Sequence, residues 1–205
     1  MSTEPIYRII ETKYDQGGMI TLASGNMAVC NIKYETVDTE EYFKNLKTGE
    51  NFKNRNFVID DIVGLLGEDG IKTVKTIINI LYIRTEKNFR NKHFATDLMK
   101  RFLDGYANSE DTIIVFRAAC TEDDYPTEPT DKQYLEFFNH MMKFLVPFGF
   151  TSIQALSGFE FSEPYLYVSP TSKAAKLTWN KFVDWWYEEH TAIMDKFKGE
   201  DNGNE

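Results

Sequence analysis

The sequence predicts a mixed α/β fold, in which a largely antiparallel sheet surrounds one central strand–loop–helix unit. The first observation is a β-rich run over residues 76–83, which leads into a polar loop over 84–92 and then into an amphipathic helix from about Phe94. The second observation is that a strand, a helix and further strands follow this unit. Flanking helices and an added C-terminal helix complete the predicted architecture.

The N-terminal part of the chain is predicted to be β-rich. Residues 6–13 and 27–35 have strand character, and Gly17-Gly18 and residues 24–26 carry turn signals. A short helix is expected over residues 38–46, with Thr39 as its cap.

The segment before the central unit is less sharply patterned. Residues 59–66 fit either a short helix or the end of a strand, because acidic residues and glycines interrupt the apolar run. The next strand is expected over residues 72–83, where Val, Thr and Ile dominate.

The helix that begins at Phe94 has a wide apolar face, because its apolar residues recur at helical spacing as far as Tyr106. A buried-type strand is expected over residues 112–119. Asp131 is expected to cap a helix that runs to Val146, where Pro147 ends it. Two more strands are expected, over 148–153 and 164–169.

The C-terminal residues are predicted to form a separate element. Residues 173–198 form one long amphipathic helix, which packs on the domain of residues 1–172 or forms a homodimer contact. Residues 199–205 are a charged tail. Trp185 beside Trp186 extends the apolar surface to a second face and is the reason for the dimer alternative.

Composition excludes several classes of function. The net charge of −9 argues against a nucleic-acid partner and favours a cationic substrate. No segment approaches the ~20 continuous apolar residues of a membrane span. Met1–Pro5 lack a basic region followed by an apolar run, so a cytoplasmic, intracellular protein is expected. Cys30 and Cys120, like the three histidines, lie too far apart to predict a metal site.

The loop before Phe94 is the first candidate site. A strand, a basic loop and a helix N-terminus form the arrangement that holds a phosphate or pyrophosphate, because the first N–H groups of a helix lack internal partners and the dipole favours an anion. Arg90 and Lys92 add positive charge to this loop. A solvated basic loop is the alternative explanation for these two residues.

The middle of the chain resembles the GNAT superfamily of acetyl-CoA-dependent N-acyltransferases. The superfamily's Arg/Gln-x-x-Gly-x-Gly/Ala motif corresponds to residues 90–95, where Arg90 and Ala95 fit and His93 replaces the middle glycine. A helix that ends in Gly149-Phe150 and a strand also fit, so the resemblance spans roughly residues 74–153. It implies a GNAT-like fold that binds acetyl-CoA and transfers the acetyl group to an amine by direct attack.

The resemblance also implies where the cofactor binds. Backbone N–H groups near the start of the helix would hold the pyrophosphate, and the pantetheine arm would lie where the strand over 79–83 splays from that over 113–117. A backbone N–H near Leu81 or Tyr82 would polarise the acyl carbonyl. The implied cofactor-binding residues are Leu81, Tyr82, Ile83, Arg90, Asn91, Lys92, His93, Phe94, Ala95, Thr96 and Asn139.

The acid and the base are harder to assign. The superfamily often places a tyrosine acid where this chain has Leu145, which cannot donate a proton. Tyr82, Tyr125 and Tyr134 are the alternative acids. Packed or rim aromatics are the competing interpretation of all three.

A general base is expected just past the strand over 112–119, where Glu122, Asp123 and Asp124 lie. A solvated acidic loop, or one that attracts a cationic amine, explains the same run. Cys120 could serve as a nucleophile, but no paired His is evident in the sequence, which favours a small buried residue.

Three functions therefore compete. The leading hypothesis is an N-acetyltransferase, with Glu122, Tyr125 and Tyr82 as candidate catalytic residues. A catalytically inactive GNAT-fold protein that binds a partner would explain His93 and Leu145. A different nucleotide-phosphate binder is the third hypothesis, and the lack of a Gly-x-x-x-x-Gly-Lys-Ser/Thr or Gly-x-Gly-x-x-Gly motif argues against it.

Overall fold

Within the described residues, the fold is built on one seven-stranded sheet with the order β1-β2-β3-β4-β5-β7-β6. This computed structural model describes residues 6–48, 56, 59–60, 62–63, 68, 72–106, 109, 111–117, 129–152 and 166–170. The strands are β1 (Tyr7–Tyr14), β2 (Gly17–Ser24), β3 (Met27–Asp38), β4 (Thr76–Thr85), β5 (Thr112–Arg117), β6 (Thr151–Ser152) and β7 (Leu166–Pro170). The helices are α1 (Thr39–Thr48), η2 (Lys87–Phe89), α3 (Phe94–Asp104), α4 (Asp131–Leu145) and η3 (Val146–Phe148).

The β4–β5 pair is parallel, and every other neighbouring pair in the sheet is antiparallel. Parallel neighbours need a crossover connection, and α3 supplies it between β4 and β5. The predicted mixed α/β class, with a mostly antiparallel sheet around one strand–loop–helix unit, is thus confirmed.

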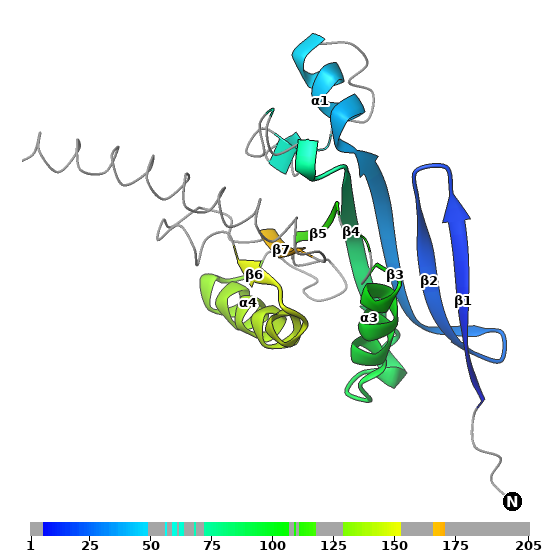
Figure 1. The fold of residues 1–205 in the computed structure, drawn as a ribbon. Coiled ribbons are helices and arrows are strands. Elements are labelled where there is room, and N and C mark those ends of the chain that lie inside the picture. The colour runs from blue at the N-terminus through cyan, green and yellow to red at the C-terminus, as the bar shows by residue number, and fades with distance from the viewer. Residues whose placement is uncertain are drawn as a thin grey trace, which may run out of the picture.

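Strands β1, β2 and β3 form a continuous antiparallel meander at one edge of the sheet (Figure 1). The sequence interpretation missed β2, because it treated Gly17-Gly18 as a turn. Both glycines lie inside β2, opposite Glu35 and Tyr34. Gly17 has φ +139°, and a Cβ there would overlap the Tyr34 carbonyl oxygen, so the strand can approach β3 only without a side chain at this position.

Helix α3 covers one face of the sheet, in front of β3 and β4 in Figure 1. Its buried residues Leu98, Met99 and Phe102 pack on inward-facing residues from four strands. The predicted apolar face of this helix is therefore confirmed. The buried sheet residues of this cluster are Ile20, Cys30, Ile32, Tyr34, Ile78, Ile80, Ile114 and Phe116.

Burial in this core changes two ionisable groups. Burial raises the pKa of the Cys30 thiol, although the hydrogen bond with Thr85 opposes the shift. Burial also raises the pKa of the Tyr106 hydroxyl, and its hydrogen bond with Tyr34 adds to the effect. Both groups therefore stay neutral at physiological pH, as core residues should.

The caps of α1 and α4 differ from the predicted ones. Asp38 accepts a hydrogen bond from the Glu41 N–H at 2.8 Å, whereas the Thr39 hydroxyl donates to the Val74 carbonyl. Helix α4 is capped by Thr130 in a capping box with Gln133, and Asp131 is its first residue. Each correction moves the cap by one residue, which pattern alone seldom fixes.

Strand β4 begins later than predicted, at Thr76, because residues 72–73 are helical. Among residues 59–66, the described ones, 59–60 and 62–63, are also helical, which settles the ambiguity for them. Ile59, Ile62, Val63 and Val74 are buried. A strand was predicted over 148–153, but Phe148 is the last residue of η3, and among the described residues of this range only Thr151–Ser152 form a strand, β6.

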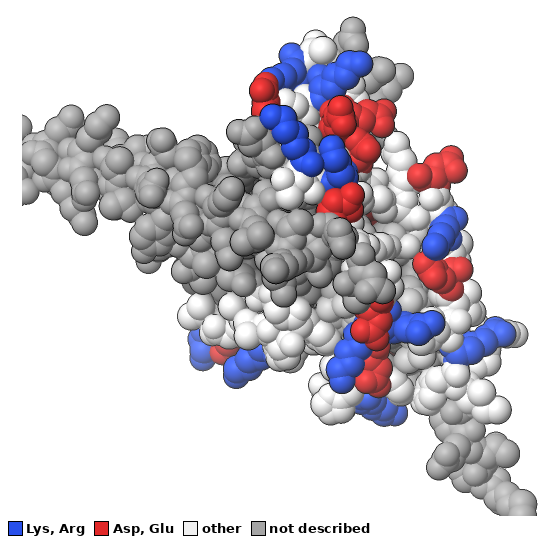
Figure 2. Space-filling model, in the orientation of Figure 1, with Lys and Arg blue, Asp and Glu red and all other residues white. Residues whose placement is uncertain are grey.

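Several predicted features lie outside the described residues. They include the C-terminal helix over 173–198, the tail over 199–205, and the loop that holds Glu122 and Tyr125. The division into these parts therefore stays a prediction. Among the described residues, no helix is long and apolar enough to cross a membrane. On the face shown in Figure 2, acidic and basic side chains of the described residues are interspersed.

Gly17→Ala is expected to destabilise the protein by about 3 kcal/mol or more, because a positive φ and a clash with β3 add together. Gly25→Ala is the matched control. Gly25 also has a positive φ (+59°), but nothing lies within 4 Å of the place that an added methyl group would take, so a loss of only about 1 kcal/mol is expected. Urea unfolding of both variants measures the difference, and equal losses would contradict the close approach of β2 to β3.

Candidate functional site

Strand β4 changes its pairing halfway along its length. Its first half pairs with β5, from Thr76 opposite Thr112 to Ile80 opposite Phe116. Beyond Ile80 it continues to Thr85 and pairs, among the described strands, with β3 alone. Among the described residues, the pairing of β4 with β5 stops at Ile80, where the predicted splay would begin. Asn79 and Ile80 belong to the paired half.

A β-bulge lies at the point where the splay begins. Tyr34 is opposite Ile80 and Lys33 is opposite Tyr82, so Leu81 is an extra residue with no partner on β3. An extra residue leaves its own backbone groups out of the ladder and bends the strand. Leu81 is also 41% exposed. The resemblance implied a free backbone N–H at Leu81 or Tyr82, and the bulge makes Leu81 the better candidate.

The loop after β4 is held close to the sheet. The Glu86 N–H donates to the Val29 carbonyl at 2.9 Å, and the Arg90 Nε donates to the Thr85 carbonyl at 3.3 Å. The Lys92 ammonium lies 5.4 Å from the centre of the Phe89 ring. The Arg90 side chain thus bonds to the end of β4 and the Lys92 side chain lies over η2, and both residues are exposed.

The first turn of α3 has unused donors. Its first intrahelical bond runs from the Asp97 N–H to the His93 carbonyl at 3.0 Å, and the His93 side chain makes no capping hydrogen bond. Helix geometry leaves the N–H groups of Phe94, Ala95 and Thr96 without internal acceptors. Together with Arg90 and Lys92, they form the donor set that an anionic phosphate needs, although Asp97 in the same turn offsets part of the charge.

His93 has a backbone conformation that normally favours glycine. Its φ is +62° and its ψ is 10°, and Asn91 also has φ +62°. Asn and His both occur in this left-handed region more often than other non-glycine residues, but a side chain with a Cβ still costs about 1–2 kcal/mol there. The residue that replaces the superfamily's glycine therefore keeps a glycine-like backbone. The cost of the missing glycine is therefore backbone strain at His93.

Tyr82 does not face the splayed strands. Its hydroxyl lies 3.9 Å from the Met19 sulfur on β2, and the residue is 39% exposed. Since β3 lies between β2 and β4, this side chain leans away from β5. Ile83 points to the other face and packs on the α3 core. Tyr82 stays a predicted acid, although this orientation does not favour it.

The other predicted residues divide into two groups. Asn139 lies on α4 and is exposed, and Leu145 is fully buried in the core. Cys120, Glu122, Asp123, Asp124 and Tyr125 lie outside the described residues. The side chain of Tyr134 does as well. Their predicted roles therefore stay predictions, and within the described residues no group of three or more His, Cys, Asp or Glu could hold a metal ion.

A polar cluster beside the bulge was not predicted from the sequence. Glu35 on β3 is opposite Asn79 on β4, and its Oε1 accepts from the Asn79 Nδ2 at 2.7 Å. The same oxygen accepts from the Asn56 Nδ2 at 2.5 Å. A polar residue within the apolar run over 76–83 was the available signal, because such a residue on a buried strand needs a partner.

Comparison with known proteins gives similarity at the level of solved structures. No protein-family model and no curated protein sequence matches the chain. The chain is similar to the polyamine N-acetyltransferase of Drosophila melanogaster, described as catalysing the formation of N-acetylagmatine. That match has 6% identity and a TM-score of 0.43, and it covers 74% of this chain and 73% of that one.

Two further structures are similar to this chain. Arabidopsis thaliana NAA60 in complex with acetyl-CoA has 13% identity and a TM-score of 0.41, over 76% of this chain and 77% of that one. FeeM, an N-acyl amino acid synthase from uncultured soil microbes, has 11% identity and a TM-score of 0.39, over 76% and 66%. Identities and TM-scores this low do not define the function of this chain.

His93→Gly is expected to raise the free energy of unfolding by about 0.5–1 kcal/mol, because glycine relieves the left-handed strain at a smaller cost in chain entropy. His93→Ala keeps a Cβ at the same φ and is expected to give no such gain. Chemical denaturation of the three proteins measures the effect. A gain of equal size in both variants would mean that the ring, and not the backbone conformation, carries the cost.

Proposed function

We propose that this protein is an N-acyltransferase that moves an acetyl group from acetyl-CoA to an amine by direct attack. The observation that carries the proposal is the continuous path from the splayed, bulged half of β4 to the start of α3. Along this path the chain offers unpaired strand backbone first and helix N–H groups with two cations afterwards. A ligand with an amide-bearing arm and a pyrophosphate needs these two kinds of partner, in this order.

The start of α3 would hold the pyrophosphate. The N–H groups of Phe94, Ala95 and Thr96 would donate to phosphate oxygens, and the helix dipole would stabilise their charge. Arg90 and Lys92 would add charge-assisted hydrogen bonds. Asn91 and His93 shape the loop through their left-handed backbones, which supports a role in presenting these donors.

The splayed half of β4 would hold the pantetheine arm and the acyl group. Backbone groups of Leu81, Tyr82 and Ile83 have no partner on the β5 side among the described strands, and such groups are suited to the amides of the arm. The N–H of the bulge residue Leu81 would polarise the acyl carbonyl and stabilise the oxyanion that forms during attack. Asn139 on α4 stays a proposed contact to the arm.

The reaction also requires proton transfer. The amine reaches the site as an ammonium and must lose a proton before attack, and the departing thiolate must gain one. Leu145 lies in the core and cannot supply that proton. Glu122 as base and Tyr125 or Tyr82 as acid are the candidates that the sequence offers.

A second candidate function is a catalytically inactive protein of this fold that binds a partner. His93 favours it, because a side chain occupies the position where a glycine would let the phosphate approach the backbone. The aromatic helix predicted over 173–198 would then be the binding surface, for a partner or for a second copy of the chain. Titration with acetyl-CoA separates the two candidates, because only the acyltransferase must bind it.

The Arg90→Ala, Lys92→Ala double variant is expected to bind acetyl-CoA roughly tenfold to a hundredfold more weakly than the wild type, because two charge-assisted contacts to phosphate are lost. Isothermal titration calorimetry measures both dissociation constants. The wild-type affinity should also fall as salt is added, since screening weakens these contacts.

The control is the Lys44→Ala, Lys47→Ala variant, which removes the same charge from α1 at the opposite end of β4. Its affinity should equal that of the wild type. If the folded wild type fails to bind acetyl-CoA at millimolar concentration, the acyltransferase proposal is wrong and the partner-binding candidate takes its place. If binding is present, thiol release in a screen of amines tests turnover.

A further inference from the structure

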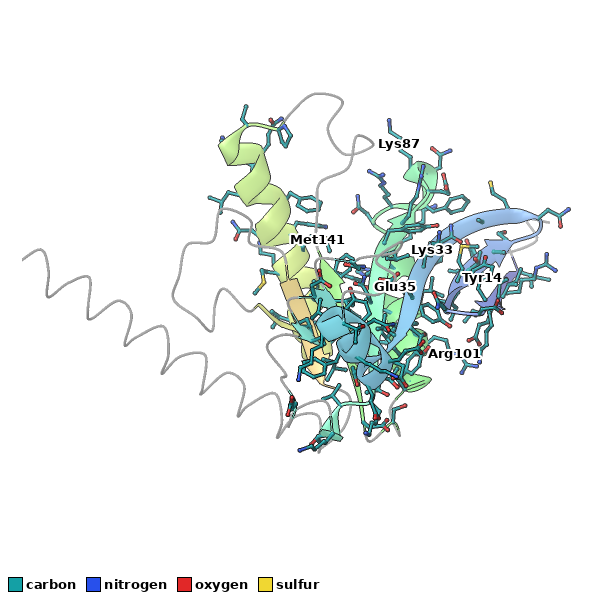
Figure 3. The ribbon with its side chains drawn as sticks, turned by 90° about the horizontal axis from the view of Figure 1, so that it is seen from above. Tyr14, Lys33, Glu35, Lys87, Arg101 and Met141 are labelled. Carbon is teal, nitrogen blue, oxygen red and sulfur yellow. The ribbon has the colours of Figure 1, made fainter. Side chains whose placement is uncertain are left out.

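We infer that Glu35 and Asn79 form the binding site for the amine substrate as a primary ammonium, with Glu35 as the base that removes its proton. The inference rests on the proposed acyl transfer for its chemistry, but the site is defined by its own geometry. The two residues are opposite each other on β3 and β4, next to the bulge at Leu81. Figure 3 labels Glu35 together with Lys33 on β3.

The side-chain carbonyl oxygen of Asn79 is a buried hydrogen-bond acceptor that lacks a donor. Asn79 is 3% exposed, and its buried Oδ1 has no hydrogen-bond partner in the part of the chain that the structure describes. Its Nδ2 donates to Glu35 at 2.7 Å, and this fixes the orientation of the amide, because a carboxylate can only accept. A buried carbonyl oxygen without a donor destabilises the folded chain, so its presence on a central strand needs an explanation.

One oxygen of the Glu35 carboxylate, Oε2, is available to a ligand. Both amide donors, Asn79 Nδ2 and Asn56 Nδ2, reach Oε1. Within the described part of the chain, Oε2 has no hydrogen-bond partner. Glu35 is half-buried, so this oxygen combines a fixed position with access from outside. Asn56 in turn bonds to Tyr42, whose hydroxyl donates to Asp60 at 2.6 Å.

The chemistry of these two oxygens matches a primary ammonium group. Asn79 Oδ1 and Glu35 Oε2 are both acceptors, and one carries negative charge. A primary ammonium has three N–H donors and no acceptor, so it satisfies both oxygens and is neutralised by the carboxylate. A quaternary ammonium carries the same charge but has no N–H to donate. The site should therefore distinguish these two cations.

Asn79 lies close to Leu81, whose N–H would bind the acyl carbonyl. Asn79 precedes the bulge residue Leu81 by two positions, which corresponds to roughly 7 Å along a strand. The side chains of Glu35 and Asn79 lie on the face opposite α3, because their neighbours Tyr34, Ile78 and Ile80 point into the α3 core. An amine bound there would approach the acyl carbon from the side of the sheet opposite α3.

In the proposed reaction, the bound ammonium loses both of its transferable protons and receives the acetyl group. One ammonium proton passes to Glu35 Oε2, and the freed lone pair forms the C–N bond to the acyl carbon. The C–S bond breaks, and its electron pair leaves on the CoA sulfur. The second amine proton neutralises this thiolate, and Glu35 releases its proton to solvent. The products are the amide, CoA thiol and one proton.

The direct test is a titration followed by the Asn79 side-chain amide signals in a ¹⁵N–¹H NMR spectrum, with Asn79→Ala used for assignment. In the full-length protein, n-butylammonium chloride should shift these signals saturably, and butyltrimethylammonium chloride should not. Glu35→Gln should abolish the response, because it keeps the Oε1 acceptor for the two amides but removes the charge. Glu41→Gln, an exposed carboxylate on α1, is the matched control and should respond as the wild type does.

Equal shifts with both cations, or none with either, would overturn the ammonium site. The second arm measures kcat/KM for n-butylamine with acetyl-CoA by thiol release. Glu35→Gln should lower it roughly a hundredfold or more while the dissociation constant for acetyl-CoA is unchanged. A loss in Glu122→Gln without one in Glu35→Gln would assign the base to Glu122. A protein that shows the NMR response but does not bind acetyl-CoA would refute the acyltransferase and leave the ammonium site standing.

Discussion

The pairing of β4 is the constraint on which the rest of the structure depends. A strand in the middle of a sheet normally satisfies its backbone on both sides, but among the described residues β4 does so only as far as Ile80. Its second half pairs with β3 on one side and with no described strand on the other. Exposed edges are a liability that proteins usually cover. A fold that leaves one open in the middle of its sheet gains a place where an extended ligand can act as the missing strand.

Two unfavourable features lie near this opening. His93 has a left-handed backbone without being glycine, and Asn79 has a buried oxygen without a donor. Each costs on the order of 1–3 kcal/mol, against a total stability of about 5–15 kcal/mol for a typical domain. Elsewhere the described core follows ordinary rules: apolar faces meet, and α1 and α4 have side-chain caps. Departures of this kind collect where binding, and not folding, sets the requirement.

The sequence allowed the central unit to be predicted because its signals are local. The β-rich run, the basic loop and the apolar stripe of α3 each depend on neighbours a few residues apart. Strand β2 was missed because Gly17-Gly18 usually marks a turn, and only the close approach of Tyr34 explains glycine there. Two features of the candidate site could not be predicted in this way, because they depend on how the strands pair across the sheet. The bulge at Leu81 and the meeting of Glu35 with Asn79 depend on which residues of β3 and β4 are opposite each other, and periodicity within one strand does not contain this information.

The bulge also sets the phase of β4. Before it, even-numbered residues face α3; after it, Ile83 and Thr85 do, because they are opposite Ile32 and Cys30. One extra residue thus lets a single strand follow two alternation patterns, with Asn79 and Tyr82 on the same face although three positions separate them. Any alignment of this chain with a relative that lacks the bulge must open a gap at Leu81. Without that gap, every residue from Tyr82 to Thr85 would be compared with one that points the opposite way.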